Sequence, residues 1–109
     1  MFDPERPETV VEVIEPKGVF GSVKGLLGSD EVGAGRAMLI RGRQVHTFGM
    51  RYAIDTVYLD SEGRILRVGT LSPRRVGPLV WPARSVLELD AGEAARLGLR
   101  EGGSLVEKR

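Results

Sequence analysis

Glycine and proline divide this chain into short segments, and that division limits the fold more than any other feature. Fifteen glycines and six prolines are spread over 109 residues. Both residue types are unfavourable inside a helix. The segments between them are rich in valine, which occurs thirteen times and favours strands. We therefore expect a mainly β fold with short elements.

The clearest local unit is a predicted hairpin. Residues 54–59 and 64–68 are the two expected strands, and Asp60-Ser61-Glu62-Gly63 is the turn between them. The Asp60 side chain can accept hydrogen bonds within the turn, and Gly63 can adopt the positive φ that such a turn needs. Apolar residues occur on both faces of 54–59, which predicts a central strand covered on both sides.

The remaining segments predict further strands and two short helices. The expected strands cover 9–14, 37–40, 85–89 and 104–107. The expected helices lie near residues 20–28 and 91–97, and Asp90 stands where the second would have its N-cap. The predicted architecture is one α+β domain over residues 9–109. Its antiparallel sheet is partly closed and barrel-like, and a flexible segment, residues 1–8, precedes it.

Composition excludes several classes of protein. The longest apolar runs are far too short to span a bilayer, and the net charge of +1 gives little attraction to nucleic acid or anionic lipid. With no cysteine and one histidine, His46, we expect no metal site, and no motif indicates a cofactor. The acidic start lacks an apolar stretch, which predicts a cytoplasmic protein. Thirteen arginines against three lysines fit either high-GC coding or a thermophile.

His46 is the centre of the candidate site, because imidazole is the side chain that titrates near neutrality. One hypothesis makes His46 a general acid or base that Asp55 orients. The alternative is that the two residues form a buried structural hydrogen bond. Both require His46 and Asp55 to meet in space.

Other residues complete the candidate site. Thr47 can donate a hydrogen bond and Arg51 can bind an anion, while Met50 suits either core packing or a soft metal. Residues 41–84 carry eight arginines against three carboxylates, which gives a local charge of +5. Ligand binding is therefore assigned to Thr47, Met50, Arg51, Arg74, Arg75 and Trp81. Phe48 and Trp81 are expected to belong to the core, with stacking on a ligand as the alternative for each.

One long motif resembles a known family. The run His46–Asp60, HTFGMRYAIDTVYLD, resembles the signature of the domain-of-unknown-function family 192, and so do the elements GLLG at 25–28 and VLEL at 86–89. The resemblance implies a single small β-rich domain and brings no established activity. Gly49, Ala53 and Gly103 depart from the family pattern, and Gly103 replaces a carboxylate.

Three functions follow from this sequence. The leading hypothesis is a non-catalytic binding module that recognises a small anionic ligand or an acidic partner segment. The alternatives are a small hydrolase or lyase that uses His46 as acid or base, and a structural accessory protein that pairs through an exposed strand.

Overall fold

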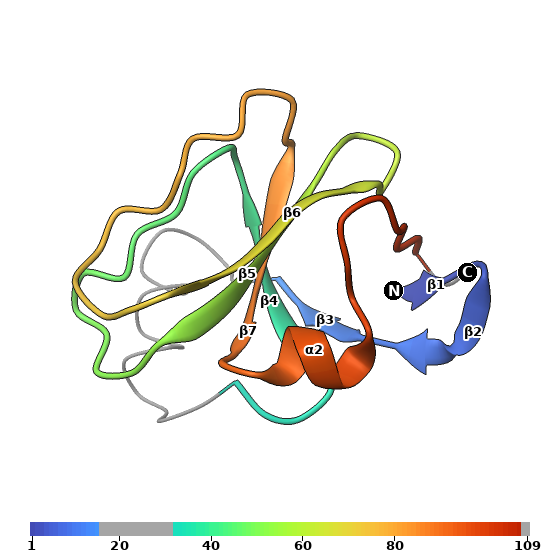
Figure 1. The fold of residues 1–109 in the computed structure, drawn as a ribbon, viewed down its shortest axis with the longest axis horizontal. Coiled ribbons are helices and arrows are strands. Elements are labelled where there is room, and N and C mark those ends of the chain that lie inside the picture. The colour runs from blue at the N-terminus through green and yellow to red at the C-terminus, as the bar shows by residue number, and fades with distance from the viewer. Residues whose placement is uncertain (16–31, 108–109) are drawn as a thin grey trace.

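The computed structural model describes residues 1–15 and 32–107 (Figure 1). Seven strands and one helix occur within the described residues. They are β1 (Phe2–Asp3), β2 (Arg6–Val10), β3 (Glu12–Ile14), β4 (Arg36–Arg41), β5 (Ile54–Leu59), β6 (Ile65–Leu71), β7 (Ser85–Asp90) and α2 (Glu93–Leu97).

The main sheet has five strands in the order β3-β4-β7-β5-β6. Strand β3 pairs with β4 in parallel, and the other neighbours are antiparallel. Strands β1 and β2 form a separate two-stranded ribbon. The predicted hairpin is confirmed: β5 and β6 pair, Asp60 Oδ1 accepts from the Glu62 and Arg64 amides, and Gly63 has a φ of 84°.

The prediction of a mainly β domain is confirmed, but the prediction of a partly closed barrel is wrong. The sheet stays open, with β3 and β6 at its two edges. The C-terminal tail satisfies backbone groups at the start of β6, because the Ile65 amide donates to Gly103 O and the Gly102 amide donates to Ile65 O. The backbone groups at the start of the β6 edge therefore have partners although the sheet does not close into a barrel.

The two expected helices have different outcomes. The one near residues 91–97 is present as α2, which is shorter than expected. The one near residues 20–28 lies outside the described residues. The expected strand at 104–107 is reduced to two isolated bridges, Arg64 with Ser104 and Phe2 with Val106.

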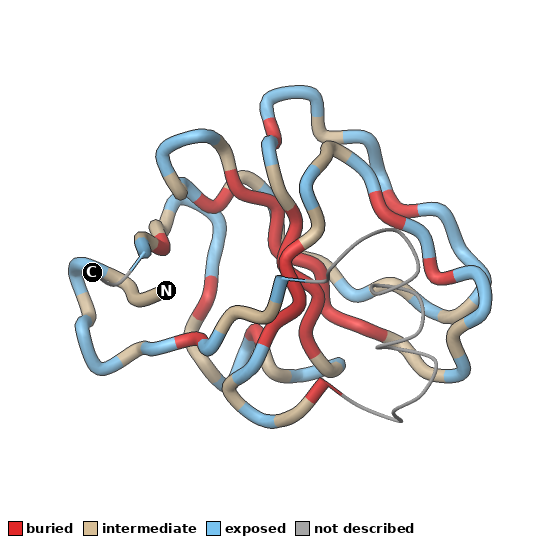
Figure 2. The backbone as a smooth tube through the Cα atoms, turned by 180° about the vertical axis from the view of Figure 1, so that it is seen from behind, coloured by how far each residue is buried: buried red, intermediate tan, exposed pale blue. Residues whose placement is uncertain are grey.

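Buried residues gather along the central strands of the molecule (Figure 2), and β5 contributes to an apolar core on each face of the main sheet. On the first face, Val57 and Leu59 belong to a cluster that also includes α2 and the C-terminal tail through Ala94 and Leu105. On the second face, Tyr58 belongs to a smaller cluster with Val45, Ala83 and Val86. Every residue of β5 is buried, as its two apolar faces predicted.

Glu88 is a carboxyl group within the sheet. It lies in β7, directly opposite Met38 of β4 and Thr56 of β5, and only 3% of its surface is exposed. Burial raises the pKa of Glu88 from 4.5 to about 7, because desolvation disfavours the charged form. The folded state therefore favours the neutral acid.

This pKa predicts how stability depends on pH. A carboxyl group with a raised folded-state pKa contributes fully below pH 4.5, and its contribution is lost as the pH rises through 7. The variant Glu88→Gln stays neutral at every pH, so it avoids the cost of burying a group that is ionised in the unfolded chain at pH 8. We therefore expect its unfolding free energy at pH 8 to be about 3 kcal/mol higher than that of the parent. Urea unfolding between pH 4.5 and 8 measures this. The exposed control Glu101→Gln should show no such trend, and a pH-independent difference for Glu88→Gln would contradict the prediction.

Candidate functional site

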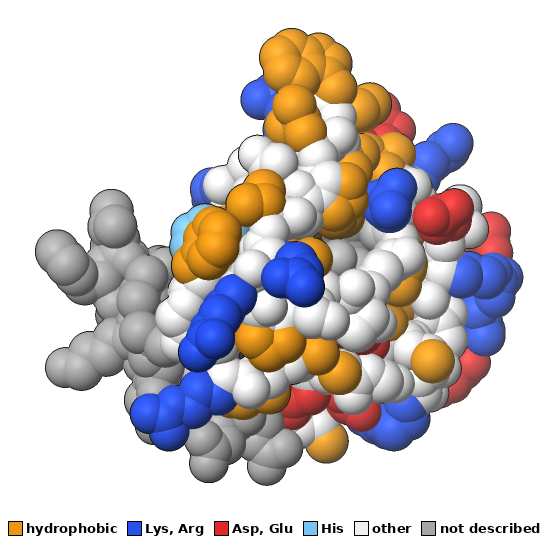
Figure 3. Space-filling model, turned by 60° about the vertical axis from the view of Figure 1, so that its left-hand side comes forward, with side chains coloured by type: hydrophobic (Ala, Val, Ile, Leu, Met, Phe, Trp, Pro, Cys, Tyr) orange, Lys and Arg blue, Asp and Glu red, His pale blue; other side chains and the backbone are white. Residues whose placement is uncertain are grey.

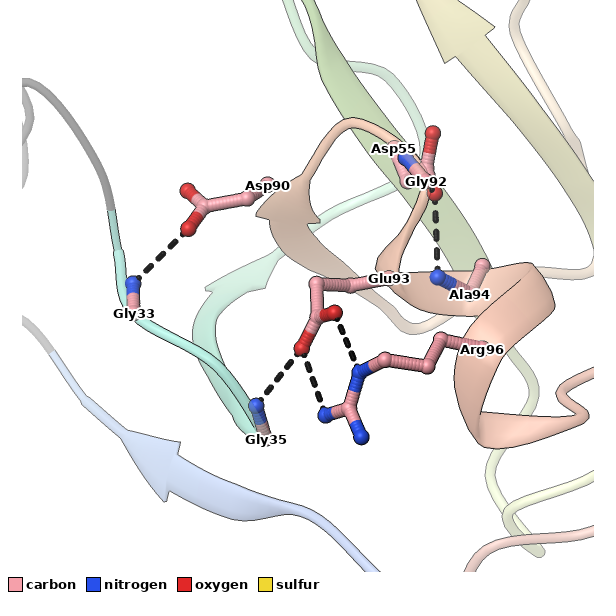
Figure 4. Close-up of polar contacts among 8 residues, drawn as sticks. All are labelled: Gly33, Gly35, Asp55, Asp90, Gly92, Glu93, Ala94 and Arg96. Atoms are coloured by element: carbon pink, nitrogen blue, oxygen red, sulfur yellow. Dashed lines mark hydrogen bonds and ion pairs between the residues drawn. The ribbon is translucent and has the colours of Figure 1, made fainter.

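Asp55 is a buried carboxylate that joins three parts of the chain (Figure 4). It lies at the second position of β5, and 4% of its surface is exposed. Thr70 Oγ1 of β6 donates to Asp55 Oδ1 at 2.8 Å. The amides of Gly92 and Ala94 donate to Asp55 Oδ2 at 2.9 and 3.0 Å. Asp55 therefore satisfies the first amides of α2 from outside the helix.

The prediction that Asp90 caps this helix is wrong. The N-cap residue is Gly92, which makes no side-chain cap. Asp90 instead accepts from the amides of Val32 and Gly33 at 2.6 and 3.0 Å. Glu93 holds the same segment, since the Gly35 amide donates to it at 2.7 Å. Arg96 and the Gly35 amide lower the pKa of Glu93 to about 2.

His46 lies in a different environment from Asp55. It is exposed in the β4–β5 loop, where it forms an isolated bridge with Val76. Its Nδ1 accepts from the Phe48 amide at 3.3 Å, and its ring centroid lies 5.3 Å from that of Phe48. Among the described residues, no hydrogen bond or ion pair joins His46 to Asp55. The donors around the Asp55 carboxylate are a hydroxyl and two amides, not the imidazole.

Two loops cover the second face of the sheet and form one unit. The β4–β5 loop, 42–53, and the β6–β7 loop, 72–84, each join strands that are parallel to one another, so each must cross the length of the sheet. They cross in opposite directions and run side by side in Figure 1. Backbone hydrogen bonds join them, among them Gly77 N to Val45 O at 2.8 Å and Val80 N to Arg43 O at 2.9 Å. We call the outer side of this pair the two-loop surface.

Two hydroxyl groups hold these loops in place. Thr47 is fully buried, and its Oγ1 donates to Ser72 O at 2.6 Å and accepts from the Arg75 amide at 2.9 Å. Tyr58 reaches out of the sheet and donates to Pro78 O at 2.8 Å. Gly77 lies between, where a Cβ would be only 3.1 Å from the Tyr58 hydroxyl. Thr47, predicted as a ligand-binding residue, thus has structural partners for its hydroxyl.

The two-loop surface exposes large apolar side chains. Of the five large hydrophobic residues exposed in the described part of the chain, four lie on it: Phe48, Val76, Leu79 and Trp81. Phe48 is 56% exposed and Trp81 is 72% exposed, so the expectation that they belong to the core is wrong. Figure 3 shows apolar side chains and arginines on this side of the molecule, next to the single histidine.

The same surface is basic. The two loops contain five arginines and no aspartate or glutamate: Arg43, Arg51, Arg74, Arg75 and Arg84. Arg51, Arg74 and Arg75, which the sequence singled out, are all exposed. The Arg43 guanidinium lies 5.1 Å from the Trp81 ring centroid, and its Nε donates to Trp81 O. The sequence analysis did not assign Arg43, Val76 or Leu79 to the site. The absence of acidic residues from both loops could have indicated that the loops form a basic surface.

Arg74 has an unusual backbone. Its φ is 60°, and it is the one non-glycine residue with positive φ in the described part of the chain. This conformation costs about 1 kcal/mol for a residue with a Cβ. The Arg74 amide donates to Thr47 O at 3.1 Å, so the turn that carries Arg74 is fixed to the neighbouring loop.

Met50 takes part in apolar packing. Met50 packs against a small cluster of Val32 and Met38. Within residues 1–15 and 32–107, no group of three histidine or acidic side chains is arranged to hold a metal ion. In the same residues, no helix is long and apolar enough to cross a membrane.

Comparison with known proteins identifies the family. The family model DUF192, described as an uncharacterized ACR, matches residues 7–106. The chain belongs to this family. No curated protein matches it.

Two solved structures resemble this DUF192 protein. A protein of unknown function from Novosphingobium aromaticivorans is 20% identical, with a TM-score of 0.69, and the match covers 86% of this chain and 73% of the other. A putative transcription regulator from Sinorhizobium meliloti is 22% identical, with a TM-score of 0.67, and the match covers 84% and 78%. At these identities the likeness shows a shared fold.

The contacts of Asp55 and His46 predict effects of different size on stability. We expect Asp55→Ala in this DUF192 protein to lower the unfolding free energy by about 3 kcal/mol, because two amides and a hydroxyl lose a charged acceptor. We expect His46→Ala to change it by less than about 0.5 kcal/mol, because the side chain is exposed. Urea unfolding measures both. Equal losses in the two variants would contradict the prediction.

Thr47 predicts how firmly the two loops are held. Thr47→Val removes the hydroxyl and leaves Ser72 O and the Arg75 amide without it, so we expect a loss of about 2 kcal/mol. Thr47→Ser retains the hydroxyl and should lose about 1 kcal/mol or less. Native-state hydrogen exchange of residues 72–84 reports the local effect. Unchanged exchange in Thr47→Val would show that the loops do not need this hydroxyl.

Proposed function

We propose that this protein is a binding module whose two-loop surface recognises an acidic partner segment that also carries apolar side chains. The observation that carries the proposal is the coincidence of exposed apolar residues and unopposed arginines on one surface. Exposed apolar patches rimmed by charge are typical of sites for protein partners.

The balance of charge favours an acidic partner. No ion pair in the described part of the chain involves Arg43, Arg51, Arg74 or Arg75. Carboxylates of a partner can form bidentate contacts with such guanidinium groups. The apolar side chains of the partner can pack on Phe48, Val76, Leu79 and Trp81.

The arrangement of the loops favours binding over catalysis by His46. A general base is normally oriented by a second group, and the carboxylate expected for that role, Asp55, accepts from Thr70, Gly92 and Ala94. The loops are instead fixed by backbone hydrogen bonds and by Thr47 and Tyr58. Such fixed loops suit recognition, because little conformational entropy is lost on binding.

Trp81 provides a direct test of the proposal. It is the single tryptophan of the chain and is largely exposed, so a bound partner should shift its fluorescence to the blue. The probes are short glutamate-rich peptides with interspersed leucines, and the matched controls carry glutamine in place of glutamate. We expect saturable binding of the acidic peptides, weakened by salt. Equal binding of the controls, or no response to any acidic peptide, would contradict the proposal.

Arg74→Gly separates binding from folding. Glycine adopts positive φ without strain, so this variant should be at least as stable as the parent. It also removes one guanidinium, and we expect about fivefold weaker binding of the acidic peptides. Arg100→Gln, which removes an exposed arginine outside both loops, should bind as the parent does. If Arg100→Gln weakened peptide binding as much as Arg74→Gly does, the affinity would depend on the net charge of the protein and not on the position of Arg74.

A further inference from the structure

A cleft of about 420 Å³ lies at the Leu59 end of β5, and Arg84 is the one residue of the two loops that lines it. Its apolar lining consists of the buried leucines Leu39, Leu59 and Leu105 and of the partly exposed Met1 and Val106. The three leucines belong to the core on the α2 side of the sheet. The volume is within the range of clefts that bind small molecules.

The cleft has two sides that come from different parts of the fold. One side is the β5–β6 turn, to which the tail is bound because the Leu105 amide donates to Gly63 O at 2.8 Å. The other side is formed by the ends of β4 and β7, where Arg41 pairs with Ser85. Gly63 leaves no room for a side chain, since a Cβ there would overlap Leu105 O. The contact between the turn and the tail is therefore close and depends on glycine.

Charges of opposite sign line the two sides. Arg41 and Arg84 belong to the strand side, and Asp60, Glu62 and Glu107 belong to the turn and tail. Arg41 forms an exposed ion pair with Glu15 at 3.1 Å, outside the set of lining residues. Among the described residues, no ion pair joins a basic residue of the cleft to an acidic one. A bound molecule with both charges can therefore contact both sides.

We propose that this cleft binds a small zwitterion with an aliphatic body, either a free amino acid or a short peptide. Its carboxylate contacts Arg84 and Arg41, and its ammonium group contacts the carboxylates of the turn and tail. Its aliphatic part packs on Met1 and Val106, the partly exposed apolar residues of the lining. This site differs from the proposed surface for an acidic partner, because it needs ligands of both charges and different apolar residues, and Arg84 is the one residue that it shares with the two loops.

Three probes of similar shape test the proposal on the unaltered protein. L-leucine carries both charges, 4-methylpentanoate lacks the ammonium group, and 3-methylbutylamine lacks the carboxylate. We expect L-leucine or L-leucyl-L-leucine to bind at millimolar concentrations, with NMR shifts at Met1 and Val106. The two singly charged probes should bind at least about fivefold more weakly. Tighter binding of L-leucine than of L-leucyl-L-leucine would indicate that the cleft takes a free amino acid. Tighter binding of the dipeptide would indicate that it takes a short peptide.

Matched variants test which side chains of the cleft contact the carboxylate of the ligand and which contact its ammonium group. Arg84→Gln and Glu62→Gln should each weaken binding about fivefold, whereas the exposed controls Arg100→Gln and Glu101→Gln should not change it. Glu62 is preferred to Asp60 for this test because Asp60 also holds the turn through two backbone amides. Absence of binding by both zwitterions would overturn the proposal, and so would equal binding of either singly charged probe. Neither result bears on the binding of acidic peptides to the two-loop surface.

Discussion

The Asp55 carboxylate is the interaction on which the arrangement around the helix depends. Helix α2 has five residues and is too short to be stable by itself. The buried Asp55 side chain accepts from the amides of its N-cap residue, Gly92, and of Ala94, which would otherwise have no partner within so short a helix. The same carboxylate binds Thr70 of β6, so the helix and the edge strand are held against β5 together. Ala94 and Leu99 then close the core on that face.

The opposite face is closed in a different way, and that difference produces the candidate site. Two crossing loops satisfy each other's backbone groups, and Val45, Val80 and Ala83 supply the apolar contacts below them. Backbone pairing and buried hydroxyl groups therefore fix the loops. Their outward side chains, Phe48 and Trp81 among them, are not needed to close the core. This leaves apolar groups and arginines together at the surface, where they can contact a partner.

Local features of the fold could be predicted from the sequence, and features that join distant residues could not. The β5–β6 hairpin was predictable because Asp60 and Gly63 act within their own turn. The role of Asp55 was not, since its donors at positions 70, 92 and 94 come together only in the folded chain. The local rule that assigned the cap to Asp90 failed for the same reason. Exposure of Trp81 was missed because hydrophobicity alone does not show which side of a loop faces the sheet.

Strand β5 separates the cleft from the part of the two-loop surface that carries Phe48 and Arg74. The β4–β5 loop enters β5 at Ile54, and the cleft begins at its other end with Leu59. All six residues of the strand are buried, and both of its neighbours pair along its whole length. Five residue steps of a strand span about 17 Å, a distance that packing on both faces makes rigid. A partner on Phe48 and Arg74 and a small zwitterion at Glu62 therefore contact different atoms, and Arg84 is the one residue that belongs to both sites.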